Sequence, residues 1–483
     1  MLLASVALLV CAGFSGCKVG PNYRAPSSLL NDHWTLEGHP RLQGDPANHS
    51  MWWKHFNDPV LDFLVDQAAT QNLTLREAGS RIMESRARRD AVIGNLFPQA
   101  QAASGNFSSS RISPNIANFF AFPGVFDPDL SPSNWTVGVG ATWELDFWGR
   151  YRRAVESADA SLDAKCAAYD EVRVLLLAEV GKTYVELRTL ENRLALAKQN
   201  LQSQEQTLGI AHKRLEAGLG TSLDIAQAET NVGQTSATLP LLEILRRQAN
   251  NRLCLLLGRN PTDLQDEIGK DGPIPHPPHN LAFGIPADLL RRRPDVRRAE
   301  RELAAQSAKI GIAKSDFYPS ISLNGSIGVA SEDFSNLLRS SSGIGVISPG
   351  FSWNLLNYGR IRNNVKAEHA AFQAHCHAYQ NAVLKSMQEA EDAQVAYIYG
   401  FDRADALHRA ANGAAMAVKD SEDLFRAGTI DFGRVYILQA ELLTQQDQLA
   451  NARGDIANNL IDLFKAMGGG WQASYCRATE TCN

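Results

Sequence analysis

The strongest constraint in this sequence is an internal repeat. The stretch Trp143–Tyr151 returns in the second half of the chain as Trp353–Ile361, with the tryptophan and the Gly-Arg pair at the same spacing. Each copy follows alternating apolar and polar residues and opens a long segment with few or no prolines. A duplicated unit of strands and a long helix predicts two similar halves of one structure.

The prolines and the apolar spacing predict where the helices lie. No proline occurs between Pro132 and Pro240 or after Pro349, and such gaps are typical of long uninterrupted helices. Apolar residues at three- and four-residue spacing favour a coiled-coil seam. We expect long helices at about 150–216, 222–257, 358–427 and 431–467. A further helical pattern runs from Pro59 to about Leu96.

Four alternating segments predict strands. They lie at about 99–111, 134–147, 319–330 and 343–355, and the clearest has an apolar, aromatic face and a small, polar face. Such strands suit a wall between lipid and water. Four strands cannot close a barrel, and an open edge in lipid is costly. We therefore expect an oligomer, mainly α-helical, with a membrane β-barrel portion continued by a long α-helical coiled-coil barrel. The alternative is a soluble β-sandwich beside a dimeric coiled coil.

The predicted elements divide the chain into five regions. They are a signal peptide at 1–16, an extended segment at 17–56, repeat 1 at 57–270, repeat 2 at 280–470 and a tail at 471–483. The apolar stretch Leu2–Val10 and the small residues before Cys17 resemble a bacterial lipoprotein signal, in which Cys17 becomes the lipidated first residue. Simple secretion with cleavage nearby is the alternative.

Composition and motifs argue against several function classes. The net charge of −5 does not point to nucleic acid. Adjacent residues of a helix point in different directions, so His375–His377 predicts no metal site. Arg291–Arg293 is expected to be a solvated helix entrance before Pro294. No catalytic motif is present, so we expect neither an enzyme nor a cofactor.

The cysteines predict no disulfide framework. The three within predicted helices, Cys166, Cys254 and Cys376, are expected to act as small buried apolar residues. Cys476 and Cys482 lie in the tail and could pair with each other.

Several motifs together resemble one family. They are Cys17–Pro26, Pro286–Glu300, Asp316–Leu323 and Leu223–Glu229, together with the aromatic-Gly-Arg repeats. The chain resembles the TolC-like outer-membrane efflux proteins, in the lipoprotein (NodT-type) branch paired with resistance–nodulation–division pumps. The resemblance covers essentially all of the mature chain.

The resemblance implies a passive exit duct for small molecules or drugs. It implies a homotrimer with one 12-stranded barrel, four strands from each chain, that is lipid-anchored in the outer membrane and extends into the periplasm. The implied partners are a periplasmic membrane-fusion adaptor, an inner-membrane pump of the resistance–nodulation–division type and outer-membrane lipid. The alternatives are a type I secretion duct for polypeptides and, in another class, a periplasmic coiled-coil adaptor.

The resemblance also implies two sets of site residues. The strand-to-helix junction comprises Trp143, Gly149, Arg150, Trp353, Gly359 and Arg360. The periplasmic tip, which meets the adaptor and holds the gate, comprises Gly218, Thr221, Leu223, Asp224, Gly428, Thr429, Asp431, Phe432, Arg434, Gln439 and Glu441.

Two interpretations of the acidic tip residues remain open. Asp224 and Asp431 favour helix starts, where carboxylates bind free backbone N–H groups. In a trimer they would also make a charged ring. The family often carries an acid about eleven residues after the glycine of the second tip, and here that position is Gln439, with Glu441 nearby.

Overall fold

The computed structural model describes residues 17–26, 34–36, 39–43, 49–111, 113, 133–270, 272–278, 281–282 and 292–471. The expected signal peptide, Cys476 and Cys482 lie outside these residues. Among the described helices, none has the length and apolar character to cross a membrane. Contacts divide the chain into two compact units. Unit 1 comprises Met1–Pro26, Met83–Ala164 and Glu300–Ala378, and unit 2 comprises Ser27–Ile82, Lys165–Ala299 and Tyr379–Asn483.

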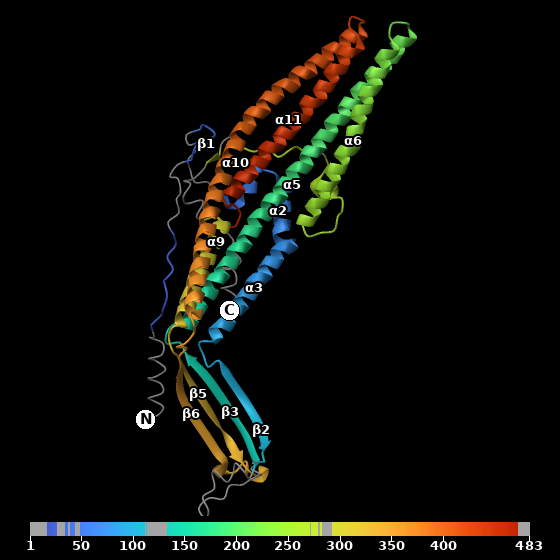
Figure 1. Ribbon diagram of the computed structural model, residues 1–483. Helices are drawn as coiled ribbons and strands as arrows, with labels where there is room; N and C mark the ends of the chain where they lie inside the picture. Colours follow the sequence, from blue (N-terminus) through green and yellow to red (C-terminus); the bar gives the residue numbers. More distant parts are fainter. Residues whose placement is uncertain are drawn as a thin grey trace, which may run out of the picture. The chain divides into compact units, whose positions relative to one another are not determined.

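Unit 1 contains a four-stranded antiparallel sheet. Its strands are β2 (Ala100–Ser109), β3 (Ser133–Leu145), β5 (Ser320–Ser331) and β6 (Gly343–Ser352). The order is β2-β3-β5-β6, so the hairpin of repeat 1 lies beside the hairpin of repeat 2 (Figure 1). Strands β2 and β6 form the two edges of this sheet.

The strand register gives the sheet two chemically different faces. Val137 pairs with Val329, and Val139 pairs with Ile327. Residues directly opposite each other project from the same face, so these aliphatic side chains gather on one side. The intervening positions carry small or polar residues, such as the pair of Thr142 with Asn324. The alternation in the sequence therefore becomes an apolar face and a mostly small, polar face.

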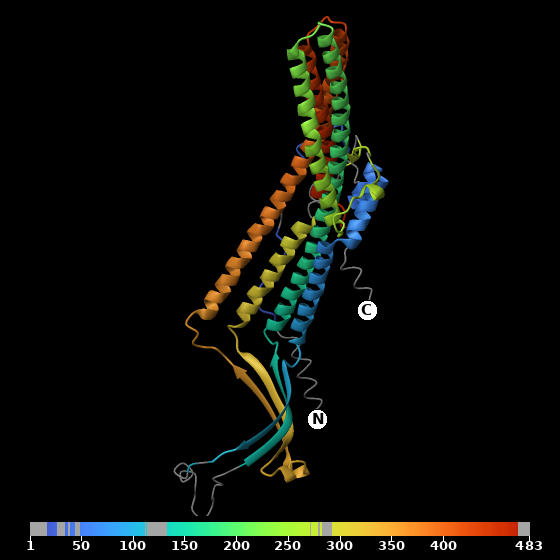
Figure 2. The same ribbon diagram turned by 90° about the vertical axis from the view of Figure 1, so that its right-hand side faces the viewer.

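A glycine pair lets the two central strands approach closely. Gly138 is paired with Gly328. A Cβ atom built at Gly328 would lie 2.4 Å from the Val137 carbonyl oxygen, and one at Gly138 would lie 2.8 Å from the Ile327 carbonyl oxygen. Figure 2 shows that the strands curve along their length. Glycine at both positions permits this approach, which larger residues would block.

The long helices of the two repeats have equal lengths. Helices α5 (Arg150–Glu216) and α10 (Arg360–Arg426) each have 67 residues. The helices that follow them, α6 (Ser222–Leu256) and α11 (Phe432–Ala466), each have 35 residues. The two halves of the chain thus have the same helical plan.

The helix expected from Pro59 to Leu96 is interrupted. Helix α2 (Pro59–Gln71) is followed by α3 (Leu73–Gly94), and Asn72 between them has an extended backbone conformation. The Asn72 side chain accepts a hydrogen bond from Leu75 N at 2.9 Å and donates one to the Leu256 carbonyl oxygen at 2.8 Å. Asparagine competes with the helix by binding nearby backbone groups, and here it caps α3 and meets the end of α6.

The shorter elements complete the architecture. They are β1 (Leu42–Gln43), η1 (His49–Phe56), α2 (Pro59–Gln71), α7 (Gln265–Ile268), β4 (Leu281–Ala282), α9 (Pro294–Ser315), η2 (Phe334–Asn336) and η3 (Ser340–Ser342). Strands β1 and β4 form a parallel pair.

The core of unit 2 forms where the N-terminal elements meet the long helices. Trp52 of η1 is buried and stacks on Phe464 of α11, with ring centroids 6.0 Å apart. It also closes over Gly181 of α5, where a Cβ atom would lie 2.9 Å from the indole. Aromatic side chains bury a large apolar area, so this tryptophan joins three parts of the chain in one core.

The expectation of a solvated arginine cluster is wrong for Arg293. Its side chain is buried and donates to the Ala466 carbonyl oxygen at 2.8 Å. It also forms ion pairs with Asp295 at 2.8 Å and Glu389 at 2.6 Å. A buried guanidinium needs such partners, and this one connects the start of α9 to α10 and to the end of α11.

Candidate functional site

The junction between strand and helix uses the same backbone device in both repeats. Gly149 and Gly359 have φ angles of +78° and +82°. This left-handed region favours glycine, and the arginine that follows each glycine is the first residue of α5 or α10. The shared spacing of the Gly-Arg pair in the two repeats therefore marks the point where a strand turns into a long helix.

The two repeated tryptophans make equivalent hydrogen bonds. Trp143 donates its indole N–H to the Leu96 carbonyl oxygen at 3.2 Å, and Trp353 donates its own to Phe317 at 3.0 Å. Leu96 and Phe317 each precede an aromatic-proline pair that leads into the first strand of their repeat. Each tryptophan thus fastens the end of one strand to the start of its hairpin partner.

The two junctions differ in how they are covered. In repeat 1, Trp148 stacks on Tyr318 at 4.5 Å and donates its indole N–H to Pro319 at 2.8 Å. The corresponding residue of repeat 2 is Tyr358, which is 97% exposed. Trp148 has the neighbouring hairpin to pack against, whereas Tyr358 follows the edge strand β6.

The charged residues also differ between the junctions. Asp146 accepts hydrogen bonds from the backbone N–H groups of Tyr151 and Arg152, both at 2.9 Å. It thus satisfies two backbone donors in the first turn of α5. Arg150 lies 3.7 Å from Asp316 and 3.9 Å from Glu144. Repeat 2 has Leu356 at the position of Asp146, and Arg360 is exposed.

The segment after Cys17 is bound to the junction of repeat 1. Val19 N donates to the Trp148 carbonyl oxygen at 3.1 Å. The buried Arg153 side chain donates to the carbonyl oxygens of Val19 and Gly20, both at 3.1 Å, and to the Asn22 side chain at 3.0 Å. These contacts place Cys17, which is exposed, beside the strand-to-helix boundary.

The turns that end the long helices are built by local capping. Gly218 and Gly428 have φ angles of +72° and +80°, as expected for left-handed C-caps. Thr221 and Asp224 form a reciprocal capping box at the start of α6. Asp431 accepts a hydrogen bond from Arg434 N at 3.2 Å at the start of α11. Both acids therefore have a capping role within the chain.

Arg214, which sequence reasoning missed, connects the two turns. Figure 1 shows the α5–α6 turn beside the α10–α11 turn. The Arg214 guanidinium donates to the Phe425 carbonyl oxygen and lies over the Phe425 ring. Phe432 meets the same ring edge to face at 5.5 Å and is buried. Phe432 therefore belongs to the core between the turns.

Gln439 lies in a buried polar layer. Its side chain is 4% exposed, accepts from Asn231 Nδ2 at 2.9 Å and donates to Thr207 Oγ1 at 3.2 Å. It also donates to Glu422 Oε1 at 2.8 Å. The four side chains come from α6, α5, α10 and α11, so Gln439 holds the helices of both repeats together within one chain.

The remaining tip residues are accessible in the single chain. Leu223 is 63% exposed, and Leu219, which the sequence did not assign to the tip, is 71% exposed. Thr429 and Glu441 are also exposed.

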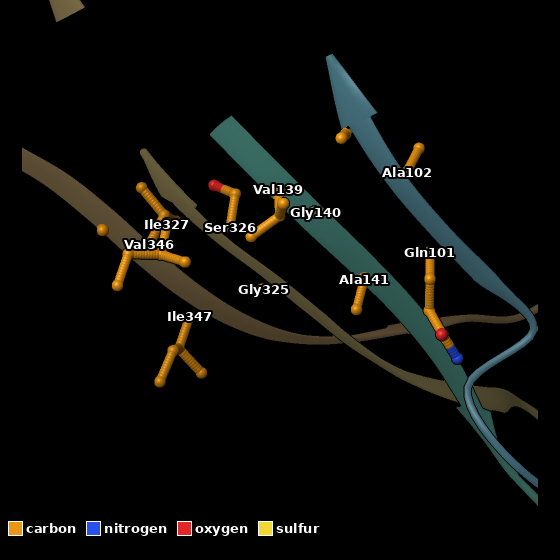
Figure 3. Close-up of a pocket in the computed structure, with 12 residues that line it drawn as sticks. Gln101, Ala102, Val139, Gly140, Ala141, Gly325, Ser326, Ile327, Val346 and Ile347 are labelled. Atoms are coloured by element: carbon orange, nitrogen blue, oxygen red, sulfur yellow. The ribbon is translucent and has the colours of Figure 1, made fainter. Parts of the chain in front are cut away.

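The apolar side of the sheet carries a shallow depression of about 730 Å³. Figure 3 shows Val139, Ile327 and Ile347 among its labelled residues, from three neighbouring strands. No ionisable side chain is among its 12 lining residues. This surface offers apolar contact and small polar groups only.

The described part of the chain contains no group of three or more His, Cys, Asp or Glu side chains that could hold a metal ion. Cys376, between the two histidines of the sequence cluster, is a free thiol. Cys166 departs from the expectation of a small apolar residue, because it is disulfide-bonded.

Comparison with known proteins gives consistent matches over nearly the whole chain. The family described as outer membrane efflux protein matches residues 64–259 and 285–469. Nodulation protein T of Rhizobium leguminosarum bv. trifolii is 30% identical over 458 residues, 95% of this chain and 95% of that protein. The solvent efflux pump outer membrane protein SrpC of Pseudomonas putida is 29% identical and covers 98% of this chain and 100% of its own.

The fold also matches a solved channel. The structure of the outer-membrane channel OprN has a TM-score of 0.87 and 30% sequence identity, and covers 94% of this chain and 100% of its own. The expected fold class, mainly α-helical with a β-barrel portion continued by a long helical barrel, is confirmed.

Proposed function

We propose that this chain, which belongs to the outer membrane efflux protein family, forms a trimeric exit duct for small molecules delivered by an inner-membrane pump and a periplasmic adaptor. Members of this family are outer-membrane efflux channels, not enzymes. One observation carries the proposal. The curved sheet has two chemically different faces, and each of its edge strands, β2 and β6, lacks a second partner strand within the described chain.

The two faces of the sheet suit a wall between lipid and water. The apolar face, with Val137, Val139 and Ile327 exposed in the single chain, would contact lipid. The opposite face carries small and polar residues such as Thr142 and Asn324. Barrel strands in membranes alternate in this way. Transport would then depend on pore width and lining polarity.

The edges of the sheet support an oligomer. Within the described sheet, β2 and β6 each have one neighbouring strand. Their outer N–H and C=O groups need partners in lipid, where no water is available. Pairing β6 of one copy with β2 of the next removes both edges, and three copies supply twelve strands.

The exposed Tyr358 supports the same contact. Internal symmetry relates Trp148 to Tyr358, and Tyr318-Pro319 to Phe97-Pro98. Since Trp148 packs on Tyr318 of the next hairpin, Tyr358 would pack on the exposed Phe97 of the next copy. An aromatic side chain of the next hairpin would then cover Tyr358 in repeat 2, as Tyr318 covers Trp148 in repeat 1.

The tip is the proposed docking surface for the adaptor. Leu219 and Leu223 expose apolar side chains next to the α5–α6 turn, and Thr429 is exposed at the turn of repeat 2. A photo-crosslinking amino acid at Leu223 should yield an adduct with a helical-hairpin adaptor protein in cells. The same substitution at Leu338, which is 89% exposed in the β5–β6 connection, should yield none with that adaptor.

Lipidation of Cys17 is proposed as the anchor. The bound segment Lys18–Asn22 holds Cys17 at the strand-to-helix boundary, where an acyl chain would reach the membrane surface. Cells fed radioactive palmitate should label the native chain, and the Cys17→Ser variant should stay unlabelled. Equal labelling of both chains would contradict the anchor.

Single-channel recording tests the duct itself. Purified, folded trimers added to a planar lipid bilayer should give discrete steps of ionic current. The same preparation dissociated by heat is the control and should give none. Folded trimers that insert without conducting, or a folded protein that is monomeric in mild detergent, would overturn the proposed function.

A further inference from the structure

The two strand-to-helix junctions carry the same pair of arginines, but only one junction supplies them with carboxylates. Arg150 and Arg152 lie at the start of α5, and Arg360 and Arg362 occupy the corresponding positions of α10. In repeat 1, carboxylates accompany both arginines. They are Glu144 and Asp316 beside Arg150, and Asp146 beside Arg152.

Repeat 2 has a neutral residue in place of each of these three carboxylates. The corresponding positions are Asn354, Leu356 and Asn95, the last because Asn95–Pro98 matches Asp316–Pro319. Arg360 and Arg362 are both exposed, and no carboxylate of the described residues forms an ion pair with either. In the proposed trimer, the next copy would bring Asn95 to this junction, which adds no negative charge. Both arginine charges therefore stay uncompensated.

We propose that Arg360 and Arg362 of three copies form an anion-attracting rim where the barrel meets the helices, and that this rim sets the charge preference of the duct. The inference rests on the proposed function, to which it adds a class of solute. Anionic solutes would pass the rim more readily than cations of the same size. Rings of arginine or lysine favour anions in pores in this way.

The arginines of repeat 1 lie at the face of the sheet that would line the pore. Glu144 pairs with Ser322 and projects from the small, polar face. Arg150 Nη1 lies 3.9 Å from Glu144 Oε1, so its side chain reaches that face. Arg152 Nε lies 2.9 Å from Asp146 Oδ2. Glu144, Arg150 and Asp146 line one cavity of about 80 Å³ at the junction.

The backbone gives the arginines of α10 the same starting direction. Gly149 and Gly359 have φ angles of +78° and +82°, and an arginine begins the helix directly after each. The tryptophans at the ends of the two preceding strands also make equivalent hydrogen bonds. Arg360 therefore leaves the chain as Arg150 does. Asn354 lines the cavity that holds Arg150, so both junctions border the same face.

The strands themselves contribute almost no charge. Glu144 is the only residue of β2, β3, β5 and β6 with an ionisable side chain. The wall of the barrel is otherwise uncharged, so the charges at its helical end dominate the potential along it. A narrow aqueous passage with low-dielectric walls focuses such a field. The rim is thus the place where the charge of a solute is sensed.

Reversal potentials test the rim in conducting trimers. A bilayer would separate about 0.1 M from about 0.01 M KCl, where charges act over about 10 Å or more. The Arg360→Gln, Arg362→Gln double variant should lower the permeability ratio of chloride to potassium. The expected change is up to about fivefold, because a unit charge about 4 Å away changes the local concentration of an ion by about that factor in water. Glu144→Gln should raise the ratio, since it removes a negative charge from the same face.

A charge-conserving variant is the matched control. Arg360→Lys with Arg362→Lys should keep the native ratio, and native gels should show that every variant forms trimers. The inference is overturned if the double glutamine variant keeps the native ratio or if the lysine variant loses it. It is also overturned if Glu144→Gln shifts the ratio in the same direction as the double glutamine variant. Conducting trimers with an unchanged ratio would overturn this inference alone, whereas trimers that never conduct would overturn the proposed duct as well.

Discussion

The guanidinium of Arg214 lies over the ring of Phe425, with 4.7 Å between the arginine Cζ and the ring centroid. Arg214 lies in the last turn of α5 and Phe425 lies in the last turn of α10, so the contact joins the tip of repeat 1 to that of repeat 2. The same guanidinium donates to the Leu219 carbonyl oxygen at 3.2 Å and to that of Phe425. One side chain thus satisfies a carbonyl group of the α5–α6 turn and one in the last turn of α10.

Replacing Arg214 with alanine should loosen this connection. The Phe425 carbonyl oxygen would lose its donor, and a lost hydrogen bond from a charged group costs about 1.5–3 kcal/mol. If the tips form the gate, we expect more frequent or larger openings in single-channel records. The control is Arg426→Ala, which removes an exposed ion pair with Asp423. Identical openings in both variants would show that Arg214 does not hold the tips.

The tip shows which features of this fold a sequence reveals. Asp224 caps the start of α6, as its interpretation as a helix-start residue predicted, because capping depends on neighbours in the chain. The role of Arg214 was not predicted from the sequence, because its main partner, Phe425, lies in the other repeat. The available signal was a break in the repeat, since Leu424 stands four residues before Gly428 where Arg214 stands before Gly218.

Burial likewise depends on contacts that the sequence does not contain. Repeats, strand alternation and proline gaps predicted the sheet and the long helices, because each arises from local periodicity. Arg293 and Gln439 are polar, and polar residues are mostly exposed. Both are buried here because partners from several helices satisfy them.

Replacing Gln439 with alanine should destabilise the helical tip. It would leave Asn231 and Glu422 without one partner each inside the protein, and each unsatisfied buried group costs about 1–3 kcal/mol. We expect a lower melting temperature by circular dichroism in detergent. The matched control is Gln445→Ala, whose side chain bonds Glu441 on the exposed surface. Equal melting temperatures for the two variants would contradict a structural role for the polar layer.

Replacing Arg153 with alanine should release the segment that follows Cys17. The variant loses the donor to the Val19 and Gly20 carbonyl oxygens and to Asn22. We expect faster trypsin cleavage after Lys18 or Arg24, measured by mass spectrometry under native conditions. Arg81→Ala, which removes an exposed ion pair with Glu77, should leave the rate unchanged. Cleavage at the native rate in the Arg153 variant would show that other contacts suffice.

Replacing Tyr358 with alanine should weaken the oligomer without unfolding the chain. The ring is 97% exposed, so the single chain loses little. In the proposed trimer, the variant loses the contact between Tyr358 of one copy and Phe97 of the next. An aromatic pair contributes about 0.5–1.5 kcal/mol beyond the burial of its area. We expect trimers to dissociate at a lower temperature in native gels. Leu338→Ala, which truncates another exposed side chain, is the control, and equal dissociation temperatures would place Tyr358 outside the interface.

The buried carboxyl of Asp170 should make stability depend on pH. Burial raises its pKa to about 6, against the opposing charges of Arg297 and Arg173. The unfolded chain has the ordinary aspartate pKa of about 4, so the folded chain holds this proton more tightly. The resulting stabilisation is fully present below about pH 4 and is lost as the pH rises through about 6.

The Asp170→Asn variant keeps the shape of the side chain but cannot ionise. The melting temperature of the variant should therefore rise relative to that of the native chain as the pH increases from about 4 to about 8. The corresponding difference in the free energy of unfolding is about 3 kcal/mol for a shift of about two pKa units. Asp455→Asn, at an exposed carboxylate paired with Arg403, should show a much smaller change. If the difference between the native chain and the Asp170 variant stays constant over this range, the pKa of Asp170 is not raised, and the charge of Arg297 offsets the effect of burial.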